Sequence, residues 1–581
     1  MASILLAIYL LAFVVFIYRL LDRARRYNSH LDFFGLVRYE LMEARRGGVG
    51  YMHFSIVAGV VLSVALALAH YVDFLALALW LLSIPVMGGL LWAAIYRVGV
   101  LRRSFEIHKK LGSREFEKES TKLQVALLLI ILMTLLDVAL SIFNYPLSLF
   151  IGTIRNILLA QFYVKPAANL VASYRREVSH FRTPFRLEEV LEGKIDVDSV
   201  KFGYSKVGDV DREVVLSCES CGEIGACDGI CPAVAAGRPL SPRVVVRTVA
   251  LNSSRPDFGL EGLETQAWAC TTCGACVYSC PVRVSHLDVI YGVRRAAVAA
   301  GRVDKKIGDV FLSMSQYGNT MSVANVDRHK WLYELGVRHI SESPDAEYLL
   351  WVGCMGSFDA RAREAVRALV EIFKKAGLKI AVLGDEETCC GDPLRRLGEE
   401  SRFQEVVLQN RELFRKYGVR KIITICPHGF NVFKNEYPQF GVELEVYHHV
   451  HIIQQLVKEG KIAPRGGGDF AIHDPCYLAR YNKVTRPQRE VLAKLGRLRE
   501  PPRRGEKTFC CGAGGGNYWY DVVEEKRISH IRFEELASTG TSTIVTLCPF
   551  CNAMLSDAAR TKGSRIVVKD LAEVVAERLS T

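Results

Sequence analysis

The feature that most constrains this 581-residue chain is a pair of adjacent cysteines near its end, Cys510 and Cys511. Their thiolates diverge from neighbouring Cα atoms, so they suit neither a disulfide nor a single tetrahedral zinc ion. A polynuclear iron–sulfur cluster accepts such a pair, because each thiolate can bind a different iron. Three more cysteines, Cys476, Cys548 and Cys551, lie in the same hundred residues. This stretch therefore predicts an iron–sulfur site.

The five cysteines resemble the ligand set of the cysteine-rich CCG domain of heterodisulfide reductase D and B subunits. HDPC from His473, CCG from Cys510 and CPFC from Cys548 match that family's single cysteine, CCG and CxxC in order. The resemblance implies a noncubane [4Fe–4S] cluster that works on thiols and disulfides. A zinc ribbon or inert buried thiols are the alternative. The predicted catalytic and metal-binding residues are Cys476, Cys510, Cys511, Cys548 and Cys551.

The pattern occurs twice. Apolar segments YLLWVG, LKIAVL and KIITIC alternate with helical segments such as AREAVRALVEIFKKAG, which is typical of an α/β fold. Cys354 precedes Cys476 by about 122 residues, and other cysteines repeat at the same spacing, which indicates an internal duplication. We therefore predict two tandem α/β CCG domains at 345–465 and 466–581, joined by RGGGD at 465–469 as a flexible linker.

The two copies differ at one predicted ligand, because Gly429 stands where the second copy has Cys551. The remaining thiolates of the first copy suit a simpler cluster, with His428 as a candidate extra ligand; alternatively they only pack as small apolar side chains. GAGGG after Cys511 predicts an uncluttered, approachable face, whereas GDPLRR after Cys390 predicts a crowded one. We expect substrate to react at the second copy. The predicted metal ligands of the first copy are Cys354, Cys389, Cys390 and Cys426.

Eight cysteines between residues 185 and 310 form two further sets, each followed by a proline. The second set is the run C-x2-C-x2-C-x3-C-P of bacterial ferredoxins, in which the fourth cysteine ligates the other cluster. The first set has five residues between Cys221 and Cys227, which we interpret as an inserted loop, GEIGA. The segment resembles the α-helical dicluster ferredoxin of succinate dehydrogenase and glycolate oxidase subunits; eight-cysteine zinc binding is the alternative. The resemblance assigns one [4Fe–4S] cluster to Cys218, Cys221, Cys227 and Cys280, and the other to Cys270, Cys273, Cys276 and Cys231.

Apolar runs near the length of a membrane-spanning helix occur before residue 175 and predict a five-helix transmembrane bundle over 1–175. Lys and Arg gather in two connecting segments, so the positive-inside rule predicts a multi-pass cell-membrane protein with its N-terminus outside and its iron–sulfur domains in the cytoplasm. These loops account for much of the net charge of +12, so we predict no nucleic-acid partner. All 17 cysteines follow residue 217, mostly in metal-ligand spacings, which indicates a reduced compartment. The five runs lie at roughly 2–19, 51–72, 74–97, 124–143 and 147–170.

Four polar residues of this segment are candidates for cofactor binding. His53 and His70 lie near opposite ends of one apolar run, as haem b ligands do in membrane cytochromes, although two interfacial histidines without haem are the alternative. Asp137 and Arg155 would lie at a similar depth, as an ion pair or as a quinone or proton-transfer site. Spans three to five contain no histidine, so the residue that completes a haem ligand pair would have to be His30, His108, His180 or a methionine such as Met87 or Met133.

The order of these parts resembles a heterodisulfide reductase D-type protein fused to a cytochrome b-type membrane subunit. The resemblance implies a membrane-bound iron–sulfur oxidoreductase that moves electrons between the quinone pool and a cytoplasmic disulfide or redox protein. The alternative is an electron-transfer subunit that serves a flavoprotein, such as a glycolate or lactate dehydrogenase or an electron-transfer flavoprotein. The chain has no GxGxxG fingerprint of its own, so hydride chemistry would need a partner.

Overall fold

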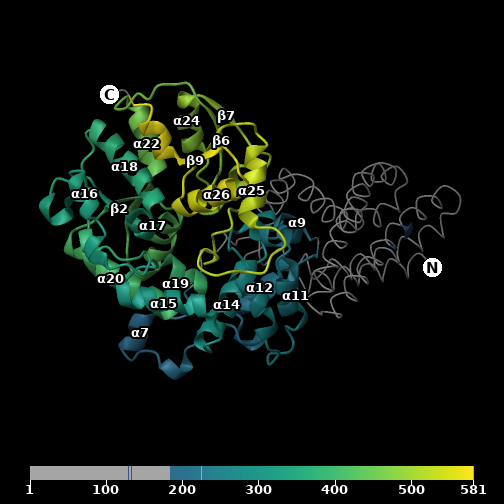
Figure 1. Cartoon of the computed structure of the whole chain (residues 1–581). Helices are drawn as coiled ribbons and strands as arrows, with labels where there is room; N and C mark the ends of the chain where they lie inside the picture. Colours follow the sequence, from purple (N-terminus) through teal and green to yellow (C-terminus); the bar gives the residue numbers. More distant parts are fainter. Residues whose placement is uncertain (1–128, 130–131, 134–182, 224, 580–581) are drawn as a thin grey trace, which may run out of the picture.

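The computed structural model describes residues 183–223 and 225–579, together with residues 129, 132 and 133. This part of the chain contains a helical domain followed by two α/β domains, which lie against one another (Figure 1).

The helical domain consists of short helices interrupted by the cysteine-bearing loops. Pro232 and Pro281 follow the last cysteine of each set, and Pro232 begins a helix, a position where proline costs no hydrogen bond. The core is apolar, with Val246 and Val249 of α11 and Val293 of α14 fully or almost fully buried. The helices are α7 (Leu187–Leu191), α8 (Arg212–Glu219), α9 (Ala226–Ile230), α10 (Pro232–Ala235), α11 (Pro242–Leu251), α12 (Glu264–Ala269), α13 (Ala275–Ser279), α14 (His286–Ala299), α15 (Lys305–Tyr317) and α16 (Lys330–Glu334).

The first α/β domain contains a five-stranded parallel sheet of order β1-β3-β2-β4-β5. Its central strands are buried on both faces, which explains why the sequence reads there as continuous apolar runs. The strands are β1 (Arg338–His339), β2 (Tyr348–Trp351), β3 (Ile380–Val382), β4 (Lys421–Thr424) and β5 (Glu445–His448). The helices are α17 (Gly353–Phe358), α18 (Ala360–Lys375), α19 (Asp392–Leu397), α20 (Glu400–Lys416), α21 (Pro427–Asn431) and α22 (His449–Lys458).

The second α/β domain repeats the first. Its parallel sheet has the order β7-β6-β8-β9, which matches β3-β2-β4-β5 strand for strand. The register is also the same, since Leu349 pairs with Ile422 in one sheet and Ala471 with Ile544, each 122 residues later, in the other. The elements are β6 (Asp469–Ile472), α23 (Cys476–Ala479), α24 (Arg486–Leu495), β7 (Arg497–Arg499), α25 (Ile528–Ala537), β8 (Thr543–Thr546), α26 (Pro549–Thr561), β9 (Val567–Asp570) and α27 (Leu571–Ala576).

The two copies share one core. Helix α18 packs on α27 and α22 packs on α24, and a single buried apolar cluster contains residues of both sheets. The join at 465–469 is tied to the second copy, because Arg465 N–H donates to Arg578 O at 2.8 Å and Gly467 N–H to Leu495 O at 2.9 Å. The predicted flexible linker is therefore a hydrogen-bonded connection.

The predicted fold class needs correction in its first component. Among the residues that the structure describes, no helix combines the length and the apolar character needed to cross a bilayer. The longest described helix, α20, has 17 residues and carries charged side chains along its length. The described fold thus consists of the helical domain and the two α/β domains, and the five-helix transmembrane bundle is wrong as part of that fold. The apolar runs on which it rested, chosen by length and hydropathy alone, lie almost wholly outside the described residues.

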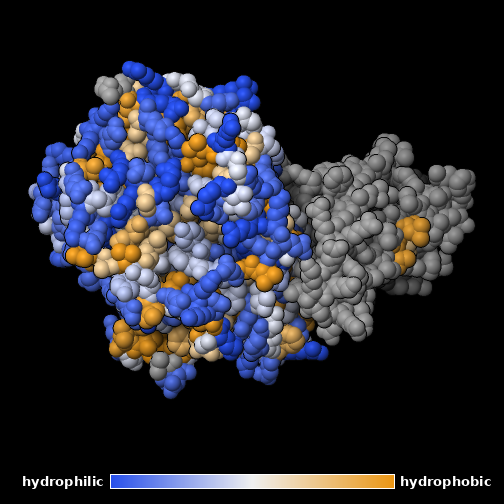
Figure 2. All heavy atoms as spheres, in the orientation of Figure 1, coloured by the Kyte–Doolittle hydropathy of each residue, from blue (hydrophilic) through white to orange (hydrophobic). Residues whose placement is uncertain are grey.

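The visible surface of the α/β domains is largely hydrophilic, with small separate apolar patches (Figure 2). His53, His70, Asp137 and Arg155 lie outside the described residues, so the haem and quinone expectations attached to them stay predictions.

Candidate iron–sulfur sites

The backbone conformation at the third position of each CCG motif requires glycine. Gly391 and Gly512 adopt φ of 86° and 102°, a region that L side chains rarely enter. In this conformation the Gly391 N–H points back at Cys389 Sγ at 3.5 Å, and the Gly512 N–H at Cys510 Sγ at 3.3 Å. Each loop thereby supplies a backbone donor to a sulfur atom, as cluster-binding loops do.

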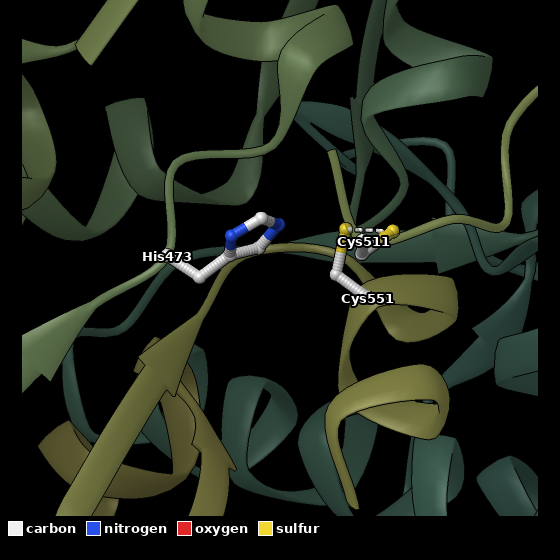
Figure 3. Close-up of side chains that lie close together, drawn as sticks. All are labelled: His473, Cys511 and Cys551. Atoms are coloured by element: carbon white, nitrogen blue, oxygen red, sulfur yellow. Dashed lines mark hydrogen bonds between the residues drawn. The ribbon is translucent and has the colours of Figure 1, made fainter. Parts of the chain in front are cut away.

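The second copy brings all five of its cysteines together, each of them buried. Cys476 begins α23 after β6, and Cys548 precedes α26 after β8, so both lie at the carboxyl ends of central strands, where α/β sheets bind ligands. The sulfur atoms of Cys511 and Cys551 are 3.2 Å apart (Figure 3). Contacts with Cys510 and Cys551 lower the pKa of Cys511, whereas burial and the contact with Cys511 raise the pKa of Cys551, as expected when one thiol donates to the sulfur of the other.

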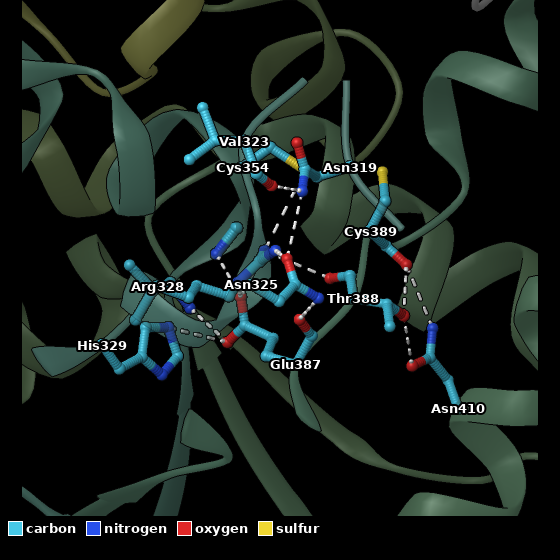
Figure 4. A network of polar contacts seen from close by, with 12 residues as sticks. Asn319, Val323, Asn325, Arg328, His329, Cys354, Glu387, Thr388, Cys389 and Asn410 are labelled. Carbon is cyan, nitrogen blue, oxygen red and sulfur yellow. Dashed lines mark hydrogen bonds and ion pairs between the residues drawn. The ribbon is translucent and has the colours of Figure 1, made fainter. Parts of the chain in front are cut away.

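The first copy gathers four thiols at the corresponding sheet edge, beside a buried polar network (Figure 4). Contact with Cys389 lowers the pKa of Cys354 to about 5, against the effect of burial and with help from the charge of Arg328. The Arg328 guanidinium lies 4.0 Å from Cys354 Sγ and 2.9 Å from Glu387 Oε1. Glu387 also accepts from the Gly353 N–H at 2.8 Å, so the carboxylate anchors both the arginine and the start of α17.

His428, the candidate extra ligand of the first copy, uses one of its ring nitrogens to contact Asp392. Its Nδ1 lies 2.9 Å from Asp392 Oδ2, and its ring stacks on Tyr477 of the second copy at 4.2 Å. The sulfurs of Cys426 and Cys548 are also in contact, and this contact raises the pKa of Cys426. The two CCG sites are therefore neighbours, and His428 lies between them.

Gly429 leaves room for the ligand that the first copy lacks. A Cβ at this position would lie 3.9 Å from Cys390 Sγ, at ordinary contact distance, and the residue is helical in α21. Cys390 corresponds to Cys511, the residue that meets Cys551 in the second copy. We expect Gly429→Cys to add a fifth thiolate and to change the electron paramagnetic resonance (EPR) spectrum of the first-copy cluster. Gly429→Ala, which adds the Cβ without the sulfur, should leave that spectrum as in the wild type; equal spectra of all three proteins would contradict the expectation.

The two halves of the helical domain repeat at 49 residues, which corrects the interpretation of GEIGA as an insertion. Glu223 and Thr272 both have positive φ, at 53° and 49°, and Gly225 and Gly274 both precede a short helix with φ of 78° and 71°. The chain therefore has the same length in both halves, with isoleucine at position 224 where the other half has Cys273. The first half instead has Cys218, which lies on α8 and has no counterpart in the second half.

We call the eight-cysteine dicluster segment the relay, and the structure groups its thiols as the ferredoxin resemblance implies. Burial raises the pKa of Cys227, and so do the neighbouring Asp228 and the thiols of Cys221 and Cys280. Burial likewise raises the pKa of Cys231, and here the neighbouring thiols are Cys273 and Cys270. The fourth cysteine of each set thus faces the other set, while the assignment of individual ligands remains a prediction.

The second relay group also touches the second CCG site. The thiols of Cys273 and Cys510 are close neighbours, and their proximity raises the pKa of Cys273 and lowers that of Cys510. Both residues, with Cys476, belong to one buried cluster. Arg480 fastens the contact by donating to Cys273 O at 2.7 Å.

The glycines of GAGGG serve this contact rather than an open face. A Cβ at Gly514 would lie 2.4 Å from Thr271 O, one at Gly515 2.5 Å from Cys270 O, and one at Gly516 2.3 Å from a Leu397 methyl carbon. The absent side chains at Gly514 and Gly515 let the loop lie directly on the cysteine loop of the relay, and the one at Gly516 lets it lie on α19 of the first CCG domain.

Gly514→Ala should therefore push the two loops apart. We expect a loss of about 1–3 kcal/mol in the free energy of unfolding, as for other overpacked sites, with slower electron exchange between the relay and the second CCG site. Gly262→Ala is the matched control, because nothing lies within 4 Å of its Cβ. Chemical denaturation and rapid-mixing spectroscopy measure the two effects; a Gly514→Ala protein as stable and as fast as the control would contradict the close packing.

A cleft of about 1010 Å³ adjoins the second site. Residues 517–530 form much of its wall, together with Gly512 and Met554. It therefore reaches the CCG loop at Gly512, and its lining carries both basic and acidic side chains.

The residues present fit iron–sulfur clusters. All 17 cysteines lie in the described part of the chain, none forms a disulfide, and they gather in groups of soft thiol ligands with backbone N–H donors. A zinc site would need only four ligands, and adjacent cysteines cannot both bind one tetrahedral zinc ion easily.

Comparison with known proteins agrees with this assignment. Residues 348–434 and 470–556 each match the model of the cysteine-rich domain named CCG, and residues 214–284 match the 4Fe-4S dicluster domain. The chain contains two CCG domains and a dicluster domain. The duplication of the CCG domain is therefore supported by the cysteine spacing, by the strand register and by the two matches to the CCG domain.

Three relatives illustrate the range of named functions. The chain is 35% identical over 428 residues to EtfAB:quinone oxidoreductase of Syntrophomonas wolfei, covering 64% of this chain and 60% of that protein. It is 34% identical to the probable iron-sulfur-binding oxidoreductase FadF of Bacillus subtilis, covering 66% and 63%. It is 28% identical to the D-type subunit of dihydromethanophenazine:CoB–CoM heterodisulfide reductase from Methanosarcina barkeri, covering 63% and 95%. The chain thus spans somewhat under two thirds of the length of the first two relatives. The names of the three relatives support the assignment of this chain as an iron–sulfur oxidoreductase that transfers electrons.

Sequence reasoning missed the residues that hold the sites together. Arg294, Arg328 and Arg480 are buried arginines that contact cysteine loops 24, 26 and 207 residues away in the chain. Arginines are common on surfaces, so only the fold distinguishes these three.

Proposed function

We propose that the chain is an iron–sulfur electron-transfer oxidoreductase that exchanges electrons between a partner flavoprotein and a quinone. The observation that carries the proposal is that Cys273 and Cys510 belong to one buried cluster, which brings the relay next to the second CCG site. A [4Fe–4S] cluster supplies reversible one-electron chemistry when thiolates bind it. Electron exchange between sites is fastest at short separation, and Cys273 and Cys510 are buried and adjacent.

The proposed ligands follow the grouping of the thiols. The relay sites would use Cys218, Cys221, Cys227 and Cys280, and Cys270, Cys273, Cys276 and Cys231. The second CCG site would use its five cysteines for a noncubane [4Fe–4S] cluster, and the first CCG site its four for a further cluster. Arg328 and the backbone N–H groups would balance the negative charge of the thiolates.

The partner classes are supported by the names of the relatives. One is named as an EtfAB:quinone oxidoreductase and another as a probable membrane-anchored ferredoxin. Because quinones reside in lipid, the proposal places the iron–sulfur domains at the cytoplasmic face of the cell membrane. Haem b is not required by any step of this proposal.

A second candidate function is reduction of a disulfide at the second CCG site. The cleft beside Gly512 and Met554 favours it, since a small substrate could reach the CCG loop there. A relative named as part of a heterodisulfide reductase also supports it.

One anaerobic experiment distinguishes the two candidates. Holoprotein would be mixed with reduced electron-transfer flavoprotein and a short-chain quinone, and separately with reduced viologen and a small-molecule disulfide. We expect quinone reduction that depends on the flavoprotein, and no turnover of the disulfide. Disulfide turnover without any flavoprotein-dependent quinone reduction would overturn the first proposal in favour of the second.

A further inference from the structure

His473 is a buried polar side chain whose ring faces the second CCG site. It follows β6, is 0% exposed, and lies with Cys511 and Cys551 in a group whose potential ligand atoms are all within 4.8 Å of one another (Figure 3). Its Nε2 has no hydrogen-bond partner among the described residues. A buried ring nitrogen without a partner is costly, so the site itself must provide one.

The other ring nitrogen determines which tautomer is present. Arg532 Nε donates a hydrogen bond to His473 Nδ1 at 3.0 Å. An arginine can only donate, so Nδ1 must use its lone pair as the acceptor. The single ring proton therefore resides on Nε2, the nitrogen that faces the sulfurs.

Arg532 is held in place for this role. Its guanidinium also donates to Glu535 Oε2 at 2.9 Å and to Arg503 O at 2.9 Å, and it is fully buried. The tautomer is thus set by a side chain that is itself fixed by an acidic residue and a backbone carbonyl.

A protonated Nε2 has no lone pair to give to iron, so His473 is excluded as a sixth ligand in this arrangement. We propose that His473 donates an N–H···S hydrogen bond to the cysteine sulfurs of the second CCG site, Cys511 or Cys551, and thereby raises the reduction potential of the cluster held there. The physical reason is that reduction adds negative charge to the sulfurs, and a hydrogen bond stabilises that added charge. The inference rests on the proposed cluster at this site.

The first copy lacks this histidine. The equivalent position, 122 residues earlier, is Trp351 in β2, whose ring packs at 5.9 and 4.9 Å from Phe414 and Phe433. The hydrogen bond from His473 would therefore distinguish the second CCG site from the first.

The test is an EPR-monitored redox titration of anaerobically purified holoprotein. In His473→Ala we expect the reduction equilibrium of the second-site cluster to shift about tenfold toward the oxidised form, which is about 59 mV lower for a one-electron couple. The relay clusters in the same sample should keep their potentials and serve as the internal control. His473→Gln, whose amide N–H can still donate, should recover most of the shift.

A second measurement requires no variant. Electron–nuclear double resonance of wild-type protein carrying ¹⁵N-histidine should show an exchangeable proton coupled to the cluster and only a weak nitrogen coupling. A strong nitrogen coupling, as from bound imidazole, would overturn the inference, and so would an unchanged potential in a fully loaded His473→Ala protein. Absence of any second-site cluster in the wild type would instead overturn the proposed function.

Discussion

Replacing Arg294 with methionine should lower the free energy of unfolding by about 3–5 kcal/mol, because it deprives several buried carbonyl oxygens of their donor and each such loss costs about 1–3 kcal/mol. The guanidinium, on α14 and 0% exposed, donates at 2.5–3.0 Å to four carbonyl oxygens. Methionine fills similar space but leaves these carbonyls unpaired in the interior. The four acceptors, which belong to the relay, the first CCG domain and the second CCG domain, are Ala267, Cys270, Arg396 and Gly515.

Chemical denaturation followed by circular dichroism measures this loss, and iron content measures whether the relay site survives. Arg302→Met is the matched control: Arg302 follows the same helix, is 45% exposed and pairs with Glu264, so its loss should cost at most about 1 kcal/mol. An Arg294→Met protein within about 1 kcal/mol of this control, with full iron content, would show that the arginine does not join the three domains.

The second large effect concerns the two CCG copies. Cys551→Ser should reduce the rate of quinone reduction at least about 100-fold. It removes a thiolate that lies 3.2 Å from Cys511 at the second CCG site, where we expect substrate to react. Cys426→Ser should reduce turnover about tenfold or less. It belongs to the first copy, but its sulfur touches Cys548, so some effect on the second site is expected.

Steady-state quinone reduction by the two holoproteins, with chemical reduction of the relay clusters checked separately, measures the difference. Both variants should retain relay clusters that dithionite reduces. Equal loss of turnover in two folded proteins with intact relays would refute the asymmetry between the copies.

The α/β architecture and the duplication could be predicted from sequence, because buried parallel strands read as apolar runs and the cysteines repeat at the same interval. The structure adds that Leu349–Ile422 and Ala471–Ile544 share one register. The gathering of the thiols was implied by the family resemblances, because the CCG cysteines come from separate loops of one sheet and not from a single local motif.

The rest could not be predicted because it depends on contacts between distant segments. Gly515 lies against Cys270, and Arg294 joins Gly515 to Arg396, through pairs separated by more than 100 residues. The glycines after Cys511 were expected to leave a face open, and the packing of the relay loop on them is invisible in a linear pattern. The interpretation of GEIGA as an insertion failed because counting between cysteines ignored the matching glycines at 225 and 274.

The most direct test of the account is EPR spectroscopy of the holoprotein at a potential where the relay and the second-site cluster are both paramagnetic. Contact between Cys273 and Cys510 predicts spectra broadened or split by spin–spin interaction between the two sites. Cys510→Ala should remove that interaction while leaving the relay signals. A wild-type spectrum equal to the simple sum of isolated clusters, in protein fully loaded with iron, would contradict the claim that the two sites are neighbours.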